Sequence, residues 1–413
     1  MRFFGNALRH ATFRRFWCAL ALSSLGTWLQ IVALAVVMLR LGGGRPRALG
    51  VLALLQAGAF LLAWPFAGAF VDRHPPRRIL EVTQLCMMVS AATLAVLCAT
   101  GRLDISALLA VSFLHALALA VDQPARGAWV AQLVPRDDLS AAASLQSVLF
   151  QLSSAVGPVL AALILSRANP AVLLALNAVS YGGVLFVVVG HRDSWAPRHP
   201  EPVSAPPRSS DSRPALLAFL RRESEVARAL LLLSALLFVG PSPALLAPIV
   251  AATSGPMMTA RLGPLLSAFG IGALAALAMM APIRRRFGPL AMAIGAASVW
   301  AVALAALSSA PSVYAQFGVL LVMGMGQALV AAGTFSLIQE RAPGGLRGRL
   351  LSLYSLLIMG VRPLGDLPAS LCVEWLGLPL TLRLCAGIVL LVAALLTPQG
   401  AGPGAGVPPS RHR

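Results

Sequence analysis

Twelve long apolar runs, separated by short turns that carry arginine, constrain this chain more than any other feature. Each run is about 20 residues long, the length that a helix rising 1.5 Å per residue needs to cross about 30 Å of hydrocarbon. Only 11% of the 413 residues are charged, whereas a soluble domain typically carries about 25%. A water-facing surface cannot be built from so few charges, so the sequence predicts an all-α integral membrane protein.

The apolar runs fall into two sets of six. The first six lie near 15–39, 48–71, 79–100, 104–124, 140–166 and 170–190, and the second six near 225–252, 263–283, 289–309, 313–337, 350–374 and 379–397. Residues 191–224 are rich in Pro, Ser and Arg, which predicts a flexible linker that ends in a short amphipathic segment. We expect six-helix halves at 1–190 and 225–397, with a disordered tail at 398–413.

The arginines are distributed unequally over the turns. The chain carries 32 basic residues, all of them arginine, and a net charge of +18. With the N-terminus inside the cell, most arginines fall on the cytoplasmic side, which arginine excess marks. We therefore expect a multi-pass protein of the cell membrane with both termini cytoplasmic. Strong basicity also occurs in nucleic-acid-binding proteins, but arginines confined to short turns indicate the lipid bilayer, and no nucleic acid, as the partner.

A short internal repeat supports two halves of the same orientation. The segment LVPRDDLSAAASLQS, which opens the fifth run, is echoed by RAPGGLRGRLLSLYS, which opens the eleventh. Pro135 and Pro343 have the same separation as Ser144 and Ser352. An offset close to half the chain predicts two pseudo-symmetric halves, although chance matches are the alternative for so short a repeat.

The turn after the second run carries a motif. Gly68, Asp72, Arg73, Arg77 and Arg78 form the pattern G-x-x-x-D-R-x-x-x-R-R within GAFVDRHPPRR. Together with the six-plus-six layout, this pattern resembles the major facilitator superfamily of transporters. The segments DQPARGAWVAQLVPRDDLSAAASLQS and SLIQERAPGGLRGRLLSLYS resemble its enterobactin-exporter-like branch, which contains drug and siderophore exporters. The resemblance implies the major facilitator fold.

The resemblance also implies that this turn acts as a conformational latch. In the family, the acid matching Asp72 interacts with the positive N-terminal end of the eleventh helix and closes the cytoplasmic side. Its expected ionic partners are Arg77 and Arg126. The alternative is a solvated topology signal that takes no part in switching. The latch hypothesis concerns Gly68, Asp72, Arg73, Arg77, Arg78 and Arg126.

Charged residues inside the spans are candidate proton-coupling groups. Arg362 and Asp366 lie near mid-membrane in the eleventh span, where a lone arginine costs about 2.5–3.5 kcal/mol. Their i, i+4 spacing lets them pair on one helical face. In the functional interpretation Asp366 exchanges a proton, while Arg362 shifts the pKa of Asp366 or binds an anionic cargo. The alternative is a structural ion pair. Asp122 is either a buried proton carrier or the partner of Arg126, and the second reading is favoured.

The remaining candidates concern the substrate cavity and the shape of the helices. The resemblance implies that spans one, four, seven and ten line a central cavity, and a mostly apolar cavity suits an amphiphilic cargo. Gly157 and Pro158 resemble the glycine-proline bend of family antiporters, and three prolines within 241–248 predict a kinked seventh span. The cavity candidates, each of which also fits an ordinary core position, are Trp28, Gln30, His115, Gln327 and Thr334.

These observations predict a secondary active transporter and not an enzyme. The sequence contains no HExxH motif and no Walker loop, and we expect neither a cofactor nor a metal site. The branch resemblance favours a monomeric, proton-coupled exporter of an amphiphilic small molecule. The alternatives are an importer of the same fold and a non-transporting membrane scaffold.

Overall fold

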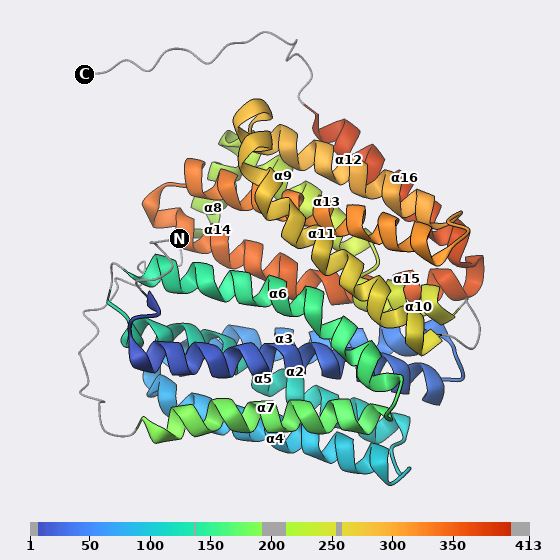
Figure 1. The fold of residues 1–413 in the computed structure, drawn as a ribbon. Helices are drawn as coiled ribbons and strands as arrows, with labels where there is room; N and C mark the ends of the chain where they lie inside the picture. Colours follow the sequence, from blue (N-terminus) through green and yellow to red (C-terminus); the bar gives the residue numbers. More distant parts are fainter. Residues whose placement is uncertain (1–6, 136–137, 192–211, 253–257, 398–413) are drawn as a thin grey trace.

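The structure is a computed structural model that describes residues 7–135, 138–191, 212–252 and 258–397. Every regular element within these ranges is a helix. Figure 1 shows the helices running alongside one another in two groups, one above the other. The tail at 398–413 and linker residues 192–211, for which we predict disorder and flexibility, lie outside the described residues.

Six helices form the N-terminal half, and each overlaps one of the expected apolar runs. The fourth extends past its expected end and therefore carries Arg126 within the helix. Prolines occupy the first turn of the second, third and sixth helices, where a missing N–H removes no intrahelical hydrogen bond. The six helices are α2 (Ala11–Leu41), α3 (Pro46–Arg73), α4 (Pro76–Ala99), α5 (Ile105–Leu133), α6 (Leu139–Leu165) and α7 (Pro170–Gly190).

The C-terminal half repeats this plan with two interrupted spans. A short helix, α8 (Ser212–Arg222), precedes it. The seventh span consists of α9 and α10, separated at 240–242, so the kink predicted from its prolines is confirmed. The eleventh consists of α14, the π-helical segment η3 and α15. The elements are α9 (Ser224–Val239), α10 (Pro243–Ala252), α11 (Met258–Phe287), α12 (Pro289–Leu307), α13 (Val313–Arg341), α14 (Gly344–Leu356), η3 (Leu357–Val361), α15 (Arg362–Leu376) and α16 (Leu378–Leu396).

The described helices provide the twelve expected crossings. Eleven helical stretches in the described part of the chain are long and apolar enough to span a membrane. The eleventh span, 344–376, does not count among them because η3 divides its α-helix into two shorter pieces. Its three segments follow one another without a gap, so together they have the length of a further crossing.

The two halves pack their helices in matching pairs. In the N-terminal half α3 packs against α5 and α4 against α7, and in the C-terminal half the corresponding helices α11 with α13 and α12 with α16 do the same. This confirms two pseudo-symmetric six-helix halves. We call the end of the bundle where α2 begins and α7 finishes the linker end, and the other the far end; Figure 1 shows the linker end on the left.

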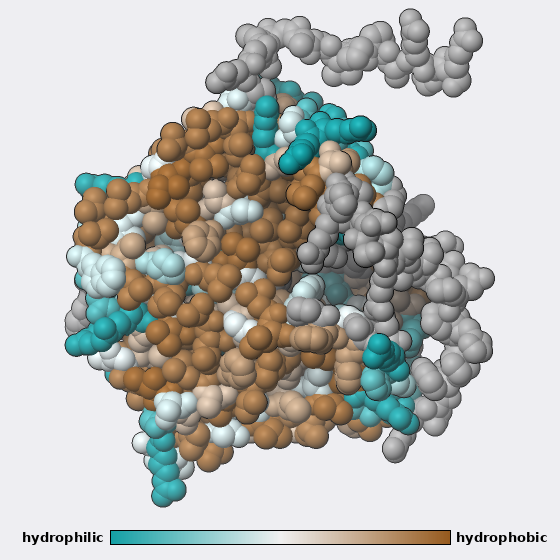
Figure 2. All heavy atoms as spheres, turned by 180° about the vertical axis from the view of Figure 1, so that it is seen from behind, coloured by the Kyte–Doolittle hydropathy of each residue, from teal (hydrophilic) through white to brown (hydrophobic). Residues whose placement is uncertain are grey.

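The outer surface of the bundle is apolar. Val179, Phe186 and Leu395 are 73%, 79% and 74% exposed. Figure 2 shows one face covered by hydrophobic residues over most of its area, with hydrophilic residues gathered toward its margins. A soluble monomer rarely exposes so large an apolar patch, so this surface fits a lipid environment.

Candidate functional site

The two halves meet along two helix pairs, α3 with α15 and α6 with α11. Small residues allow their backbones to approach closely toward the far end. A Cβ atom on Gly50 of α3 would meet Ser370 of α15, and one on Gly263 of α11 would meet Ala162 of α6. Small residues at such contacts are the usual means by which membrane helices pack tightly. The halves are therefore in direct contact at the far end.

An ion pair also bridges the halves at the far end. Arg47 Nε and Glu374 Oε2 lie 3.7 Å apart, between the first turns of α3 and the last turn of α15. The side chains are 48% and 25% exposed. Because the two residues belong to different halves, this pair depends on how the halves are placed relative to each other.

A carboxylate from the eleventh span holds the break in the seventh. The backbone N–H of Ser242, directly before α10, has no acceptor in a preceding helical turn. Asp366 Oδ1 accepts a hydrogen bond from it at 2.8 Å, and Ser242 Oγ accepts from the Leu245 N–H at 3.1 Å. Asp366 is only 4% exposed, so this bond gives a buried polar group a partner whose absence would be costly.

Arg362 binds a different partner from the one that the sequence predicts. Its Nη2 atom donates to Gln327 Oε1 of α13 at 2.8 Å, whereas Asp366 accepts from Ser242. The i, i+4 ion pair between Arg362 and Asp366 does not form among these described residues. The physical reason is the break in the seventh span, whose free N–H competes for the carboxylate. Arg362 and Gln327 are both partly exposed.

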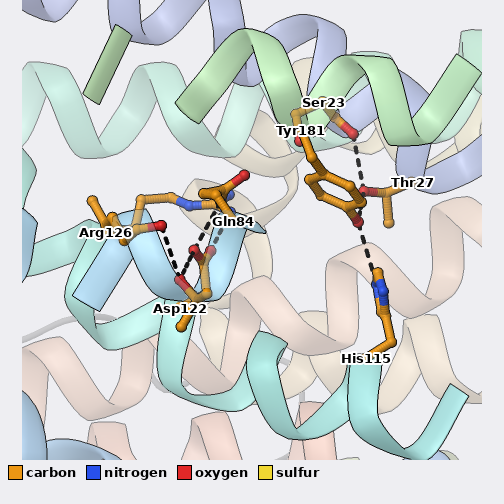
Figure 3. Close-up of polar contacts among 9 residues, drawn as sticks. Ser23, Thr27, Gln84, His115, Asp122, Arg126 and Tyr181 are labelled. Atoms are coloured by element: carbon orange, nitrogen blue, oxygen red, sulfur yellow. Dashed lines mark hydrogen bonds and ion pairs between the residues drawn. The ribbon is translucent and has the colours of Figure 1, made fainter. Parts of the chain in front are cut away.

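In the N-terminal half, Asp122 is enclosed by partners. The residue is fully buried. Its Oδ1 atom accepts from Thr83 Oγ1 at 2.9 Å and from Gln84 Nε2 at 2.8 Å, and its Oδ2 atom pairs with Arg126. Figure 3 shows Gln84 and Arg126 pointing toward Asp122. Three donors from α4 and α5 thus converge on one carboxylate. This arrangement fits the reading of Asp122 as the partner of Arg126.

A second polar group joins α2, α5 and α7. The Tyr181 hydroxyl lies 3.3 Å from His115 Nε2 and 3.5 Å from Thr27 Oγ1, and Figure 3 shows the three side chains meeting between their helices. Nearby, Asn177 Nδ2 donates to Gln30 Oε1 at 2.7 Å. These bonds give partners to the Tyr181 hydroxyl, His115 Nε2 and the Gln30 oxygen in an apolar interior, where unpaired polar groups would destabilise the packing.

Three of the five cavity candidates occupy core positions. Gln30, His115 and Thr334 are 5%, 6% and 0% exposed, and each forms hydrogen bonds within its own half. The structure therefore favours the core alternative for these three, because buried polar side chains partner one another between membrane helices. Trp28 and Gln327 remain partly exposed.

Gly157 lies at a close contact between α6 and α2. A Cβ atom there would meet the Trp28 side chain, and the Trp28 ring packs against Phe150 with 6.2 Å between centroids. Pro158 follows inside α6, and Figure 1 shows α6 changing direction along its length. Gly157 thus serves helix packing, and its contribution to antiport stays a prediction.

The basic turn after α3 is tied to the end of α7. Arg77 pairs with Glu81 at 2.7 Å and donates through Nε to the Val188 carbonyl at 3.0 Å, where the last carbonyls of α7 lack intrahelical donors. The sequence predicts Arg77 and Arg126 as partners of Asp72, but each arginine pairs with an acid of its own half one turn away. The Asp72 side chain lies outside the described ones. Of the other residues of the motif, Gly68 lies inside α3, and Gly68, Arg73 and Arg78 are all exposed.

Several site residues carry no signal in the local sequence. Thr83 and Gln84 reach Asp122 from another helix, and Tyr181 reaches His115 in the same way. Partners so distant in sequence cannot be paired by spacing. Ser242 is the exception, since it lies between two prolines at the predicted kink.

With this geometry in place, comparison with known proteins identifies the family. A family model described as a transmembrane secretion effector of the major facilitator type matches residues 5–403. The chain belongs to this family. The superfamily predicted from the sequence is therefore confirmed, and this transporter can be compared with solved members of the same fold. No curated protein matches the chain.

Three solved transporters show how widely the fold is shared. The D-xylose-proton symporter has a TM-score of 0.72 at 12% identity, and the match covers 94% of this chain and 97% of that one. The nucleoside transporter NupG has a TM-score of 0.71 at 12% identity, covering 94% and 98%. A bacterial homologue of the iron transporter ferroportin, in an inward-facing state, has a TM-score of 0.67 at 19% identity, covering 93% and 98%. Identities this low establish the fold alone.

Proposed function

We propose that this transporter is a proton-coupled exporter of an amphiphilic small molecule, such as a drug, a siderophore or another secondary metabolite. The observation that carries the proposal is the seam between the halves, formed by α3 with α15 and α6 with α11. Backbones approach closely along it toward the far end, and the partly exposed Arg362–Gln327 pair lies beside it. In this architecture a cargo site near the bilayer midplane opens to one side at a time as the two halves rock.

We assign the linker end to the cytoplasm. Arg77, the run 284–286 and Arg341 all lie at that end, and an excess of arginine marks the cytoplasmic side of a membrane protein. Both termini would then lie inside the cell. With the halves in contact toward the far end, the structure corresponds to a conformation closed to the outside.

Asp366 is the proposed proton-coupling acid. It accepts one hydrogen bond from the Ser242 N–H at the break of the seventh span, and it lies one helical turn after Arg362 on α15. Neutralising Asp366 weakens the charge-assisted bond to Ser242 and so loosens α10 against α15. Asp122 is the weaker candidate, because three donors already hold its carboxylate.

Transport into proteoliposomes tests this proposal. The purified chain is reconstituted, a proton gradient is imposed, and a panel of cationic, neutral and anionic amphiphilic dyes is followed by fluorescence. We expect uphill movement of at least one dye that an uncoupler abolishes and that Asp366→Asn no longer couples to protons. Glu340→Gln is the matched control, since Glu340 pairs with Arg284 at an exposed position. Wild-type vesicles that move no dye against its gradient would contradict proton-driven export.

The alternatives predict different results in the same vesicles. An importer moves dye in the opposite direction, which is read from vesicles of known orientation. A membrane scaffold moves no dye, whether or not it carries Asp72→Asn. In a transporter, a latch at Asp72 predicts slower transport by a folded Asp72→Asn protein. Equal transport rates in wild type and Asp72→Asn would remove the latch from the mechanism.

A further inference from the structure

Arg362 and Gln327 together present an excess of hydrogen-bond donors inside the membrane-spanning bundle. A guanidinium has five N–H donors and no acceptor, and an amide has two N–H donors and one acceptor oxygen. That oxygen already accepts from Arg362 Nη2 at 2.8 Å. Both side chains are partly exposed. The pair therefore offers more N–H donors than acceptor lone pairs to a bound molecule.

The acids of the same half are already engaged elsewhere. Arg362 has no ion pair among the described residues, and its nearest acid along the helix, Asp366, accepts from a backbone N–H instead. An arginine at mid-depth without a bound counter-ion is unfavourable in a membrane protein unless it serves a ligand or an ion. The partners of the described acids are Arg341 for Glu223 and Glu225, Arg284 for Glu340, Arg47 for Glu374 and the Ser242 N–H for Asp366.

The position of Arg362 places the pair beside the seam. Arg362 directly follows η3, and π-helical segments occur frequently at functional sites. A Cβ atom on Gly360 of η3 would meet Leu61 of α3 in the other half. Gln327 lies on α13, the tenth span. The donors thus stand where the eleventh span touches the opposite half, so movement of the halves changes their surroundings.

We propose that Arg362 and Gln327 bind the anionic headgroup of the cargo, a carboxylate-type oxyanion on an amphiphilic body. This inference rests on the proposed function and narrows its substrate class. Arginine matches a carboxylate with two parallel N–H donors, a geometry that lysine does not reproduce.

Isothermal titration calorimetry of the purified full-length protein in lipid nanodiscs tests the site with a matched pair of probes. The pair is 1-naphthoate and its neutral analogue 1-naphthamide. Wild type should bind naphthoate about tenfold more tightly than naphthamide, the scale of a charge-assisted hydrogen bond. Arg362→Gln should remove this preference and leave naphthamide binding unchanged. The control is Arg383→Gln, because Arg383 donates to the Ser308 hydroxyl at an exposed position.

Each outcome decides for or against the anion site. Equal binding of the two probes by wild type overturns it, as does a preference that survives in Arg362→Gln or disappears equally in Arg383→Gln. If Arg362→Gln does not fold, Arg362→Lys takes its place, and a reduced naphthoate preference is expected because the charge stays while the paired donors are lost. Binding that depends on Arg362 without any dye transport in vesicles would leave the anion site standing and refute the exporter proposal.

Discussion

Breaking the ion pair between Arg47 and Glu374 should shift this transporter away from the conformation described above. The two charged atoms lie 3.7 Å apart, where two unit charges attract by about 1 kcal/mol in water and about 4 kcal/mol at an effective dielectric constant of 20. Side-chain exposures of 48% and 25% place the pair near the weaker limit, and exposed pairs measure about 0.2–1 kcal/mol. We therefore expect a change of about 1.4-fold to fivefold in the ratio of conformations.

The assay measures the separation of the halves at the far end. Spin labels at Arg102 and Tyr314, both exposed, report the distance distribution by double electron–electron resonance in a background without native cysteines. Glu374→Gln should populate a longer distance, and exchanging the charges with Arg47→Glu and Glu374→Arg should restore the original distribution. Glu340→Gln, whose partner lies in the same half, should change nothing. An unchanged distribution in Glu374→Gln, or the same shift in Glu340→Gln, would refute the reasoning.

Three further changes test the packing and electrostatics of single positions. Gly365→Ala should lower the free energy of unfolding by about 1–3 kcal/mol, seen as a lower melting temperature in detergent, because the added Cβ atom would meet the Phe238 backbone. Gly387→Ala should leave the melting temperature unchanged, because a Cβ atom there has open space. Asp122→Ala should cost about 1–3 kcal/mol in denaturant titrations, since the buried donors of Thr83 and Gln84 lose their acceptor. Hydrogen bonds from the Ala107 N–H and the Ser106 hydroxyl hold the pKa of Asp104 below its usual value. The ionised carboxylate therefore contributes folding stability above its unfolded pKa, and this contribution is lost as the pH falls through the folded pKa. Asp104→Asn should accordingly lose less stability on acidification than wild type.

The fold follows from the sequence because membrane crossing imposes a strong constraint on length and polarity. Each described helix of the bundle overlaps an expected run, and the prolines around Ser242 predict the break in the seventh span. The eleventh span shows the limit of that approach. Its π-helical segment leaves no mark in the hydropathy pattern, since a change of helix type alters hydrogen bonding and not composition.

The partners of the charged residues could be predicted only where both lie on one helix. Asp122 and Arg126 are four residues apart and do pair. Arg362 and Asp366 have the same spacing and do not pair, because Ser242 and Gln327, both distant in sequence, compete for them. Spacing identifies which groups are able to meet, but the free N–H of a broken helix decides which contact forms.

The close glycine contacts within the C-terminal half have a consequence for measuring motion. Gly272 would clash with the Leu321 backbone and Gly324 with the Phe269 backbone if either gained a Cβ atom, so α11 and α13 are fastened together at two depths. Reporters attached to these two helices should keep a constant spacing through the whole transport cycle. That spacing would serve as an internal reference distance against which displacements between the halves are measured.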